Sequence, residues 1–358
     1  MVIQTMWKDR LCDADLEGEA GAAIVERIER LSRMGCGLVR FAVPDIAAAE
    51  TLGRLAGMVS MPLTADIHFD YKIALRCMDF PIAKIRINPG NIGGREKVRA
   101  VLEKAAERGI PLRIGVNAGS LPRDLREKAG AEAEALEAGA GAKALVEAAG
   151  RELALCGEFG FANVVVSMKA SGIADTIKAN RILAAQTDAP LHIGVTEAGP
   201  LVVGTARSSA ALAALLAEGI GDTLRVSLSD SVENEVVAAR EICNAAAEIA
   251  ALDGKPHTAA RLRRGGVTVI SCPRCGRHRF DTHGFTNRWL PKLYALDREM
   301  TVAIMGCEVN GPEEARHADI GITGSGDKAL IFRRGAVVRT VPAEEADAAF
   351  AEEIGLIE

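Results

Sequence analysis

Three cysteines in the last third of the chain are the residues best suited to hold a metal centre. Cys272 and Cys275 lie in Ser-Cys-Pro-Arg-Cys-Gly-Arg, and Cys307 follows in Met-Gly-Cys-Glu-Val-Asn-Gly-Pro. Two thiolates at C-x-x-C spacing can bind one metal centre, because a tight turn puts both sulfurs on the same side. A third thiolate leaves one coordination position open, and metals do chemistry at such a position. Glu314, seven residues after Cys307, is a nearby oxygen ligand for it.

The cysteine spacing fits two kinds of centre equally well. A C-P-x-C-G segment is also half of a zinc knuckle, and His278 or His283 could complete a Cys3His zinc site. However, a structural zinc site often uses two paired motifs, and the sequence has no second C-x-x-C. Spacing alone therefore leaves an iron–sulfur cluster and a structural zinc ion as alternatives.

The composition predicts a globular protein with an aliphatic core. Of the 358 residues, 49% are hydrophobic but only 4% are aromatic, so Val, Ile, Leu and Ala must fill the interior. The net charge of −5 argues against a nucleic-acid-binding protein, which would carry a basic surface. No signal peptide is visible and no apolar run reaches the roughly 18 residues of a membrane span. We therefore expect a cytoplasmic protein with reduced thiols and no membrane association.

The elements that would position these residues alternate between strand and helix over the first ~245 residues, the order expected of an α/β fold. The expected strands are 2–6, 38–43, 63–68, 84–88, 112–117, 164–169, 191–196 and 223–229. Eight such strands predict a (β/α)8 TIM barrel. An open doubly wound sheet is the alternative, but no Gly-rich dinucleotide turn follows the first strand.

The domain boundaries follow from this alternation. We expect the barrel to occupy residues 1–250 and a polar, basic linker to occupy residues 251–264. Residues 265–358 then form a smaller α+β domain that carries the cysteines. Its expected strands are 267–270, 300–305, 319–323, 328–333 and 336–341, and its closing helix is 342–354.

One face of the predicted barrel strands is polar, although barrel interiors are usually aliphatic. Alternation along the strands places these cations inside: Arg40, Arg86, Arg113, Lys169 and Arg225. Some of them could pair with Asp66 or Glu197. Burying the whole set unpaired would be very costly, so we expect an anionic ligand at the C-terminal mouth of the barrel. Arginine forks suit a diphosphate or a polycarboxylate.

Seven segments in order give the chain a specific resemblance to a known family. They are Ala65-Asp-Ile-His-Phe-Asp-Tyr71, Lys84-Ile-Arg-Ile-Asn-Pro-Gly-Asn-Ile-Gly93, Leu112-Arg-Ile-Gly-Val-Asn-Ala-Gly-Ser-Leu121, Val166-Ser-Met-Lys-Ala-Ser171, His192-Ile-Gly-Val-Thr-Glu-Ala-Gly199, the Cys272 pair, and Met305-Gly-Cys-Glu-Val-Asn-Gly-Pro312 with Ala318-Asp-Ile-Gly-Ile322. Over nearly its whole length the chain resembles the bacterial two-domain 4-hydroxy-3-methylbut-2-enyl diphosphate synthases, the IspG/GcpE family.

The resemblance implies an enzyme of the non-mevalonate (MEP) isoprenoid pathway. Such enzymes open the ring of 2-C-methyl-D-erythritol 2,4-cyclodiphosphate and remove a hydroxyl by reduction. A flavodoxin or ferredoxin supplies the electrons, and a homodimer shares each site between its chains. The implied ligands of a [4Fe–4S] cluster are Cys272, Cys275, Cys307 and Glu314. The implied substrate-binding residues are Arg40, Arg86, Arg113, Asn117, Lys169, Arg225 and Ser227.

Three further roles are hypotheses about this chain. Glu197, at the end of the seventh expected strand, protonates the departing hydroxyl from a partly desolvated site that raises its pKa. Asp66 and His68 position the substrate. Glu314 is the cluster ligand that is released most readily, because a carboxylate holds cluster iron less tightly than a thiolate does.

The chain departs from the family pattern at two places. Glu313 stands where the family usually has Gly, so two adjacent glutamates compete for the ligand role. Thr5-Met-Trp-Lys-Asp stands where the family usually has Ser-Met-Thr-Asn-Thr, so Trp7 and Lys8 could change the substrate site. The alternative functions are a zinc-bearing barrel hydrolase or aldolase and a non-catalytic binding module.

Overall fold

The computed structural model describes residues 1–88, 92–127, 141–307 and 310–356. The chain divides into two compact units, Met1–Arg264 and Gly265–Glu358, and each has its own sheet. The motif at 84–93 and the segment after Cys307 lie partly outside the described residues.

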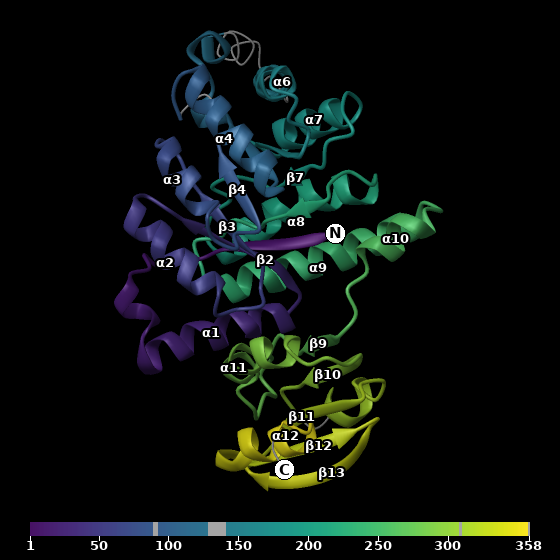
Figure 1. Cartoon of the computed structure of the whole chain (residues 1–358). Helices are drawn as coiled ribbons and strands as arrows, with labels where there is room; N and C mark the ends of the chain where they lie inside the picture. The colour runs from purple at the N-terminus through teal and green to yellow at the C-terminus, as the bar shows by residue number, and fades with distance from the viewer. Residues whose placement is uncertain (89–91, 128–140, 308–309, 357–358) are drawn as a thin grey trace. The chain divides into compact units, whose positions relative to one another are not determined.

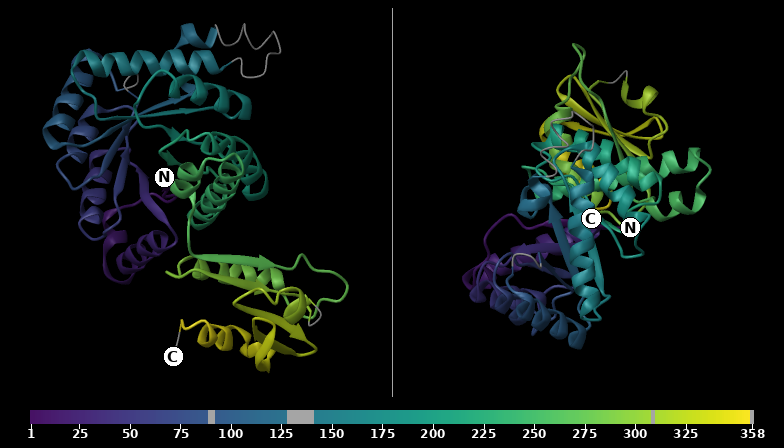
Figure 2. Two further views of the ribbon diagram at one scale, coloured as in Figure 1. Left: turned by 90° about the vertical axis from the view of Figure 1, so that its right-hand side faces the viewer. Right: turned by 90° about the horizontal axis from the view of Figure 1, so that it is seen from above.

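The first unit is a parallel eight-stranded barrel with helices on its outside (Figures 1 and 2). Its strands are β1 (Val2–Met6), β2 (Cys36–Ala42), β3 (Leu63–Asp66), β4 (Lys84–Ile87), β5 (Leu112–Asn117), β6 (Val164–Lys169), β7 (His192–Ile193) and β8 (Thr223–Leu224). The sheet runs in the order β6-β5-β4-β3-β2-β1-β8-β7, and an isolated bridge between Val166 and Leu191 brings its two ends together. This confirms the predicted TIM barrel.

The helices that follow the strands cover the barrel. They are α1 (Gly18–Arg33), α2 (Ile46–Ala56), α3 (Tyr71–Cys77), α4 (Arg95–Arg108), α6 (Ala142–Glu158), α7 (Ile173–Ala184), α8 (Leu201–Ala217) and α9 (Val232–Leu252), with the short 3-10 helices η1 (Asp13–Leu16) and η2 (Ala118–Ser120). Helix α9 begins where the Ser231 side chain accepts a hydrogen bond from the Asn234 amide. That cap fixes the first turn of α9 beside the end of β8.

The last two barrel strands are shorter than the sequence predicts. Strands β7 and β8 each have 2 residues in the regular ladder. Directly after β7, a Cβ on Gly194 would lie 2.6 Å from Lys169 Nζ and 2.6 Å from the Arg225 carbonyl oxygen. The chain therefore passes close to a buried lysine at this point, and only glycine leaves it room.

The segment expected to be a linker is largely helical. Residues Pro256–Leu262 form α10, which packs against α9 and α8, and the first unit extends to Arg264. Proline at the start of α10 favours helix formation, because its missing N–H would lack a partner there anyway. The basic residues of this segment therefore belong partly to a helix and partly to the connection between the two units.

The second unit is a mixed sheet in the order β13-β12-β11-β10-β9. Its elements are β9 (Val267–Ser271), α11 (Thr282–Tyr294), β10 (Met300–Ile304), the π-helical turn η3 (Asn310–Glu314), β11 (Ile320–Ser325), β12 (Lys328–Arg333), β13 (Ala336–Pro342), the 3-10 helix η4 (Ala343–Glu345) and α12 (Ala346–Glu353). Strands β9, β10 and β11 are parallel to one another, whereas β12 pairs antiparallel with both β11 and β13. The sequence did not predict helix α11.

The two faces of this sheet have different coverings. On one face, α11 and α12 pack together through Trp289 and Phe350, whose rings meet edge-on with centroids 5.0 Å apart. In a separate cluster, Met305 and Phe332 pack with Ala315, which holds the segment after Cys307 against the sheet. Within the described ranges, no helix is long and apolar enough to cross a membrane.

Candidate functional site

The barrel interior brings together the cations that strand alternation placed there. Arg86, Arg113 and Lys169 are buried, and the side chains of Arg40 and Arg225 are only 11% and 12% exposed. Two glycines make room for them. A Cβ on Gly115 would lie 2.6 Å from Arg86 Nε, just as one on Gly194 would meet Lys169.

The cluster of barrel cations consists of Arg40, Arg86, Arg113, Lys169 and Arg225. Asp66 is the carboxylate that contacts Arg40 and Arg86 in this cluster. Its Oδ1 accepts a hydrogen bond of 3.0 Å from Arg86 Nη1, and its Oδ2 lies 3.5 Å from Arg40 Nε. Burial disfavours the ionised form, but a hydrogen bond from His68 and the adjacent guanidinium charges outweigh burial and hold the pKa of Asp66 far below its usual value. Asp66 is therefore ionised at neutral pH.

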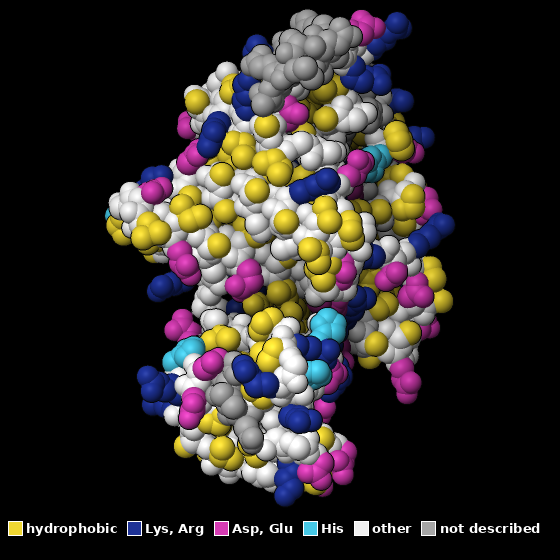
Figure 3. All heavy atoms as spheres, turned by 180° about the vertical axis from the view of Figure 1, so that it is seen from behind, with side chains coloured by type: hydrophobic (Ala, Val, Ile, Leu, Met, Phe, Trp, Pro, Cys, Tyr) yellow, Lys and Arg dark blue, Asp and Glu magenta, His cyan; other side chains and the backbone are white. Residues whose placement is uncertain are grey.

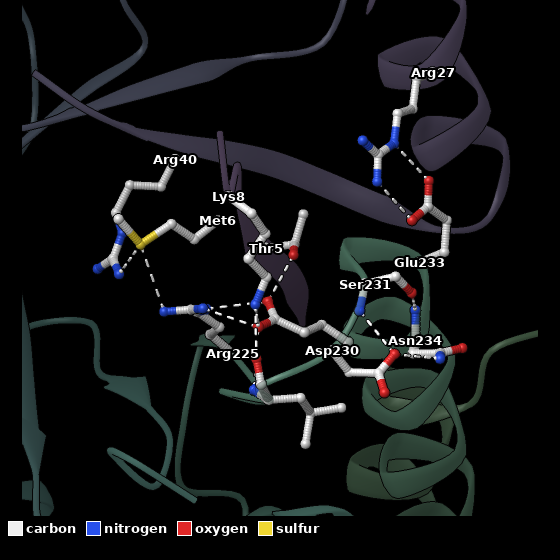
Figure 4. Close-up of polar contacts among 12 residues, drawn as sticks. Thr5, Met6, Lys8, Arg27, Arg40, Arg225, Asp230, Ser231, Glu233 and Asn234 are labelled. Atoms are coloured by element: carbon white, nitrogen blue, oxygen red, sulfur yellow. Dashed lines mark hydrogen bonds and ion pairs between the residues drawn. The ribbon is translucent and has the colours of Figure 1, made fainter. Parts of the chain in front are cut away.

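Glu235, in the first turn of α9, is the second carboxylate among the barrel cations. Figure 4 labels its partners Thr5, Lys8 and Arg225. Arg225 binds Glu235 through Nη2, 2.9 Å from Oε1, and through Nε, 3.2 Å from Oε2. It also accepts hydrogen bonds from Lys8 Nζ at 2.6 Å and Thr5 Oγ1 at 2.7 Å. Burial raises the pKa of Glu235, but Arg225 and Lys8 outweigh that effect and lower it.

The remaining cations have little compensation. Arg113 Nη1 donates to Gln4 Oε1 at 2.9 Å, while its Nε has no partner among the described residues. Lys169 has neither a hydrogen bond nor an ion pair among those residues. Burial first, and then neighbouring positive charge, lowers the pKa of both groups well below the usual values, and burial lowers that of Arg40 to about 10. The interior thus carries excess positive charge that an anion would balance.

The other expected site residues lie around this cluster. His68 Nε2 is 2.9 Å from Arg86 Nη1, and its side chain is 48% exposed, so it can contact both the cluster and a ligand. Asn117 is the half-buried last residue of β5, and Ser227 is half-buried beyond β8. Each therefore lies at or beyond the carboxyl end of its strand.

Glu197 differs from the expectation in its surroundings. It is exposed, so this chain alone does not provide the partly desolvated site. It forms no ion pair with the barrel cations among the described residues; Glu235 has that role instead. Its φ of 51° is in the left-handed region, an uncommon conformation for a residue other than glycine. The backbone is held in a restricted conformation where β7 reaches the barrel mouth.

The residues at the end of β1 and directly after it have different surroundings. Met6 Sδ accepts from Arg40 Nη2 at 2.9 Å and from Arg225 Nη1 at 3.6 Å. Trp7 is buried against Phe41, with ring centroids 5.5 Å apart, and the Arg27 guanidinium lies 5.0 Å from its centroid. Trp7 is therefore a packing residue between β2 and α1, whereas Lys8 reaches the charged cluster.

In the second unit, the cysteine motifs follow the carboxyl ends of two adjacent parallel strands. Cys272 is one residue beyond β9, and its amide donates to the Ile304 carbonyl of β10 at 2.9 Å. Cys307 follows β10, and a Cβ on Gly306 would lie 3.5 Å from Cys272 Sγ. Arg274, at φ 71°, turns the chain between Cys272 and Cys275. The three thiols thus belong to one edge of the unit.

The thiols at this edge are the type of ligand that holds an iron–sulfur cluster. No disulfide joins Cys272, Cys275 or Cys307 in the described part of the chain, and the π-helical turn that ends at Glu314 follows Cys307. Glu313 and Glu314 are both exposed. In the described residues, no three Cys, His, Asp or Glu side chains are close enough to hold a single ion. His278 Nδ1 contacts the Cys275 carbonyl, and His283 Nε2 contacts Asn287.

The surface around the cysteine pair is basic. Cys275 is exposed, and Arg274, Arg277 and Arg279 are exposed beside it. Figure 3 shows Lys, Arg and His side chains on one face of the second unit, with Asp and Glu side chains among them.

Sequence reasoning missed Glu235, Thr5 and Gln4. Alternation along β1 places Gln4 and Met6 on the same face of the strand, and this was the signal that could have identified Gln4. Glu235 lies on a helix, so strand alternation had no bearing on it. Its position one turn after the Ser231 cap was the available signal.

Comparisons with known proteins agree with both units. Residues 1–240 match the GcpE TIM-barrel domain, and residues 268–355 match the GcpE protein C-terminal domain. The 4-hydroxy-3-methylbut-2-en-1-yl diphosphate synthase (flavodoxin) of Treponema pallidum (strain Nichols) is 50% identical, over 98% of this chain and 85% of that protein. The proteins of the same name from Treponema denticola and Geobacter sulfurreducens are 48% and 44% identical, over 95% and 96% of this chain and 86% and 90% of theirs. The chain belongs to the GcpE family.

Proposed function

We propose that this chain is a 4-hydroxy-3-methylbut-2-enyl diphosphate synthase that converts 2-C-methyl-D-erythritol 2,4-cyclodiphosphate to its product in the non-mevalonate pathway. The observation that carries the proposal is the under-compensated positive charge inside the barrel. Asp66 and Glu235 cannot balance Arg40, Arg86, Arg113, Lys169 and Arg225. A cyclic diphosphate supplies the missing negative charge.

The barrel residues bind and orient the substrate. Arg40 and Arg225 approach the same Met6 sulfur, which is a weak acceptor, so phosphate oxygens replace it readily. The ligand also accepts hydrogen bonds from residues around the barrel cations, namely His68, Asn117 and Ser227. The fixed guanidinium charges also stabilise the negative charge released when the ring C–O bond breaks.

We propose a [4Fe–4S] cluster on Cys272, Cys275, Cys307 and Glu314. When bound, it supplies low-potential electrons one at a time, and the reaction consumes two of them. Glu197 holds the proton that leaves with the hydroxyl as water. Because Glu197 is exposed in a single chain, water is excluded from it when a partner chain covers it. We therefore propose a homodimer with each site shared between its chains.

The electron donor is a flavodoxin, as in the names of the relatives, or a ferredoxin. The exposed arginines around Cys275 give an acidic donor protein a complementary surface. Docking there brings the donor next to a cluster thiolate.

Protein purified without oxygen tests the function directly. We expect about four iron and four sulfide per chain, a brown colour, and conversion of the cyclodiphosphate with reduced flavodoxin. Colourless protein that binds only zinc and turns over no cyclodiphosphate would contradict the proposal.

A further inference from the structure

Lys8 lies two residues beyond β1, at the edge of the charged cluster (Figure 4). Its Nζ lies 2.6 Å from Glu235 Oε1 and 2.8 Å from the Leu228 carbonyl oxygen. The Lys8 side chain is 32% exposed, whereas the Glu235 side chain is fully buried. Lys8 thus brings a positive charge from the rim to a buried carboxylate.

Two cations share this carboxylate. Arg225 binds both Glu235 oxygens, and Lys8 binds Oε1 as well. Without Lys8, movement of Arg225 away from Glu235 would leave a buried carboxylate with no cationic partner, at a high energetic cost. With Lys8 in place, Glu235 keeps an ion pair, together with its bonds from Thr5 and the Leu228 amide, when Arg225 moves.

Arg225 is already directed toward the anion site on its other side. Its Nη1 contacts Met6 Sδ, and Arg40 Nη2 contacts the same sulfur. A thioether satisfies a guanidinium N–H poorly. A phosphate at this point would accept stronger, charge-assisted hydrogen bonds from both guanidinium groups.

We propose that Lys8 is a positioning residue for diphosphate binding, which neutralises Glu235 so that Arg225 can turn from that carboxylate to phosphate oxygens beside Arg40. This inference rests on the proposed function of the barrel mouth. Lys8 acts through Glu235 and need not touch the ligand.

Binding of inorganic pyrophosphate to the full chain, measured by calorimetry at low and physiological salt, tests the inference. Lys8→Met should raise the Kd on the order of tenfold, and added salt should reduce the difference. Arg10→Met is the matched control, because Arg10 also follows β1 but is 78% exposed and, among the described residues, pairs with Asp45 alone at the surface. It should bind as the wild type does. Wild-type protein that binds no pyrophosphate would contradict the proposed function itself; equal binding by wild type and Lys8→Met would overturn only the role of Lys8.

A second variant separates an indirect from a direct role. Glu235→Gln removes the charge that Lys8 neutralises, so Lys8→Met should add little to the Kd in that background. An undiminished effect there would mean that Lys8 contacts the ligand directly and would overturn the positioning role. Lys8→Arg keeps the charge and should restore the affinity, which decides the question even if Glu235→Gln does not fold; failure of that rescue would also overturn the proposal. In turnover, Lys8→Met should raise KM while kcat stays within about twofold.

Discussion

Asp66 Oδ1 accepts a hydrogen bond of 3.0 Å from Arg86 Nη1 between the adjacent strands β3 and β4, and both side chains are buried. The pair joins the two strands among the buried barrel cations. Arg40 lies on the other oxygen of the same carboxylate. Asp66 therefore supports the fold as well as the candidate ligand site.

Replacement of Asp66 by Asn should destabilise the protein. The variant keeps the shape but leaves Arg40 and Arg86 without their counter-charge, and loss of one partner of a buried pair costs about 3–5 kcal/mol. Urea denaturation at pH 7 measures the free energy of unfolding. Asp253→Asn is the control. In the described part of the chain, the only ion pair of the Asp253 side chain is an exposed one with Lys255, so this change should alter stability by less than about 0.5 kcal/mol.

The same variant tests the pH dependence. Because the pKa of Asp66 is lower in the folded than in the unfolded chain, its contribution is present above the unfolded value of about 3.9 and is lost as the pH falls below it. Wild-type stability should therefore decline more steeply below about pH 4 than that of Asp66→Asn. Parallel curves would contradict this assignment.

The fold was predictable because local signals agreed with it. Strands β5 and β6 have the predicted bounds, since their alternating or continuous apolar residues are framed by polar turns. Strands β7 and β8 are shorter than predicted, and Gly194, directly after β7, passes close to Lys169 Nζ and the Arg225 carbonyl, a contact between distant residues that no local pattern contains. Helix α10 was missed because its short basic sequence is equally typical of a linker.

The candidate site was predictable where chemistry lay on the strands. Arginine and lysine at alternate strand positions had to face the interior, and the structure places them there. The counter-charges of these cations were harder to predict, because Glu235 lies on a helix and is far in sequence from Thr5 and Lys8. Pairing of this kind depends on tertiary structure and on the exact helix start.

The half-buried position of Lys84, at the amino-terminal end of β4, should lower the stability of the folded protein by an amount that depends on pH. Lys84 is the first residue of β4, and burial, assisted by Arg113, lowers its pKa from 10.5 to about 8. Between these values the unfolded chain binds a proton that the folded chain has lost, so stability rises with pH over this range. Lys84→Met should increase the free energy of unfolding at pH 7 and remove most of that rise. Lys72→Met, at an exposed position, is the control and should leave the pH profile unchanged.

Glu197→Gln should separate catalysis from binding. Glutamine keeps the size of the side chain but cannot deliver a proton, so kcat should fall on the order of 100- to 10,000-fold. Pyrophosphate affinity should stay near that of the wild type, because Glu197 makes no ion pair with the barrel cations among the described residues. Stopped assays of product formation and calorimetry measure the two quantities. A variant with unchanged kcat would assign the proton to another group.

Glu313 and Glu314 provide a matched pair for the cluster ligand. Both are exposed and adjacent in the π-helical turn, so alanine at either position should leave the second unit folded. Glu314→Ala should lower iron and sulfide content and speed loss of the visible absorption in air, since only three thiolates remain. Glu313→Ala should match the wild type. The opposite result would move the ligand role to Glu313.

Lys169 should show that the ligand site is built at the expense of stability. It is 6% exposed, has no hydrogen-bond or ion-pair partner among the described residues, and its pKa is well below the usual value because of burial. Methionine has a similar volume and no charge to desolvate, so Lys169→Met should stabilise the ligand-free protein by about 1–3 kcal/mol. The same change removes a buried cation from the anion site, so pyrophosphate should bind at least about 100-fold more weakly. Denaturation and calorimetry on the same preparation test both effects. A less stable variant would mean that Lys169 has a protein anion as partner, and unchanged affinity would place the diphosphate elsewhere.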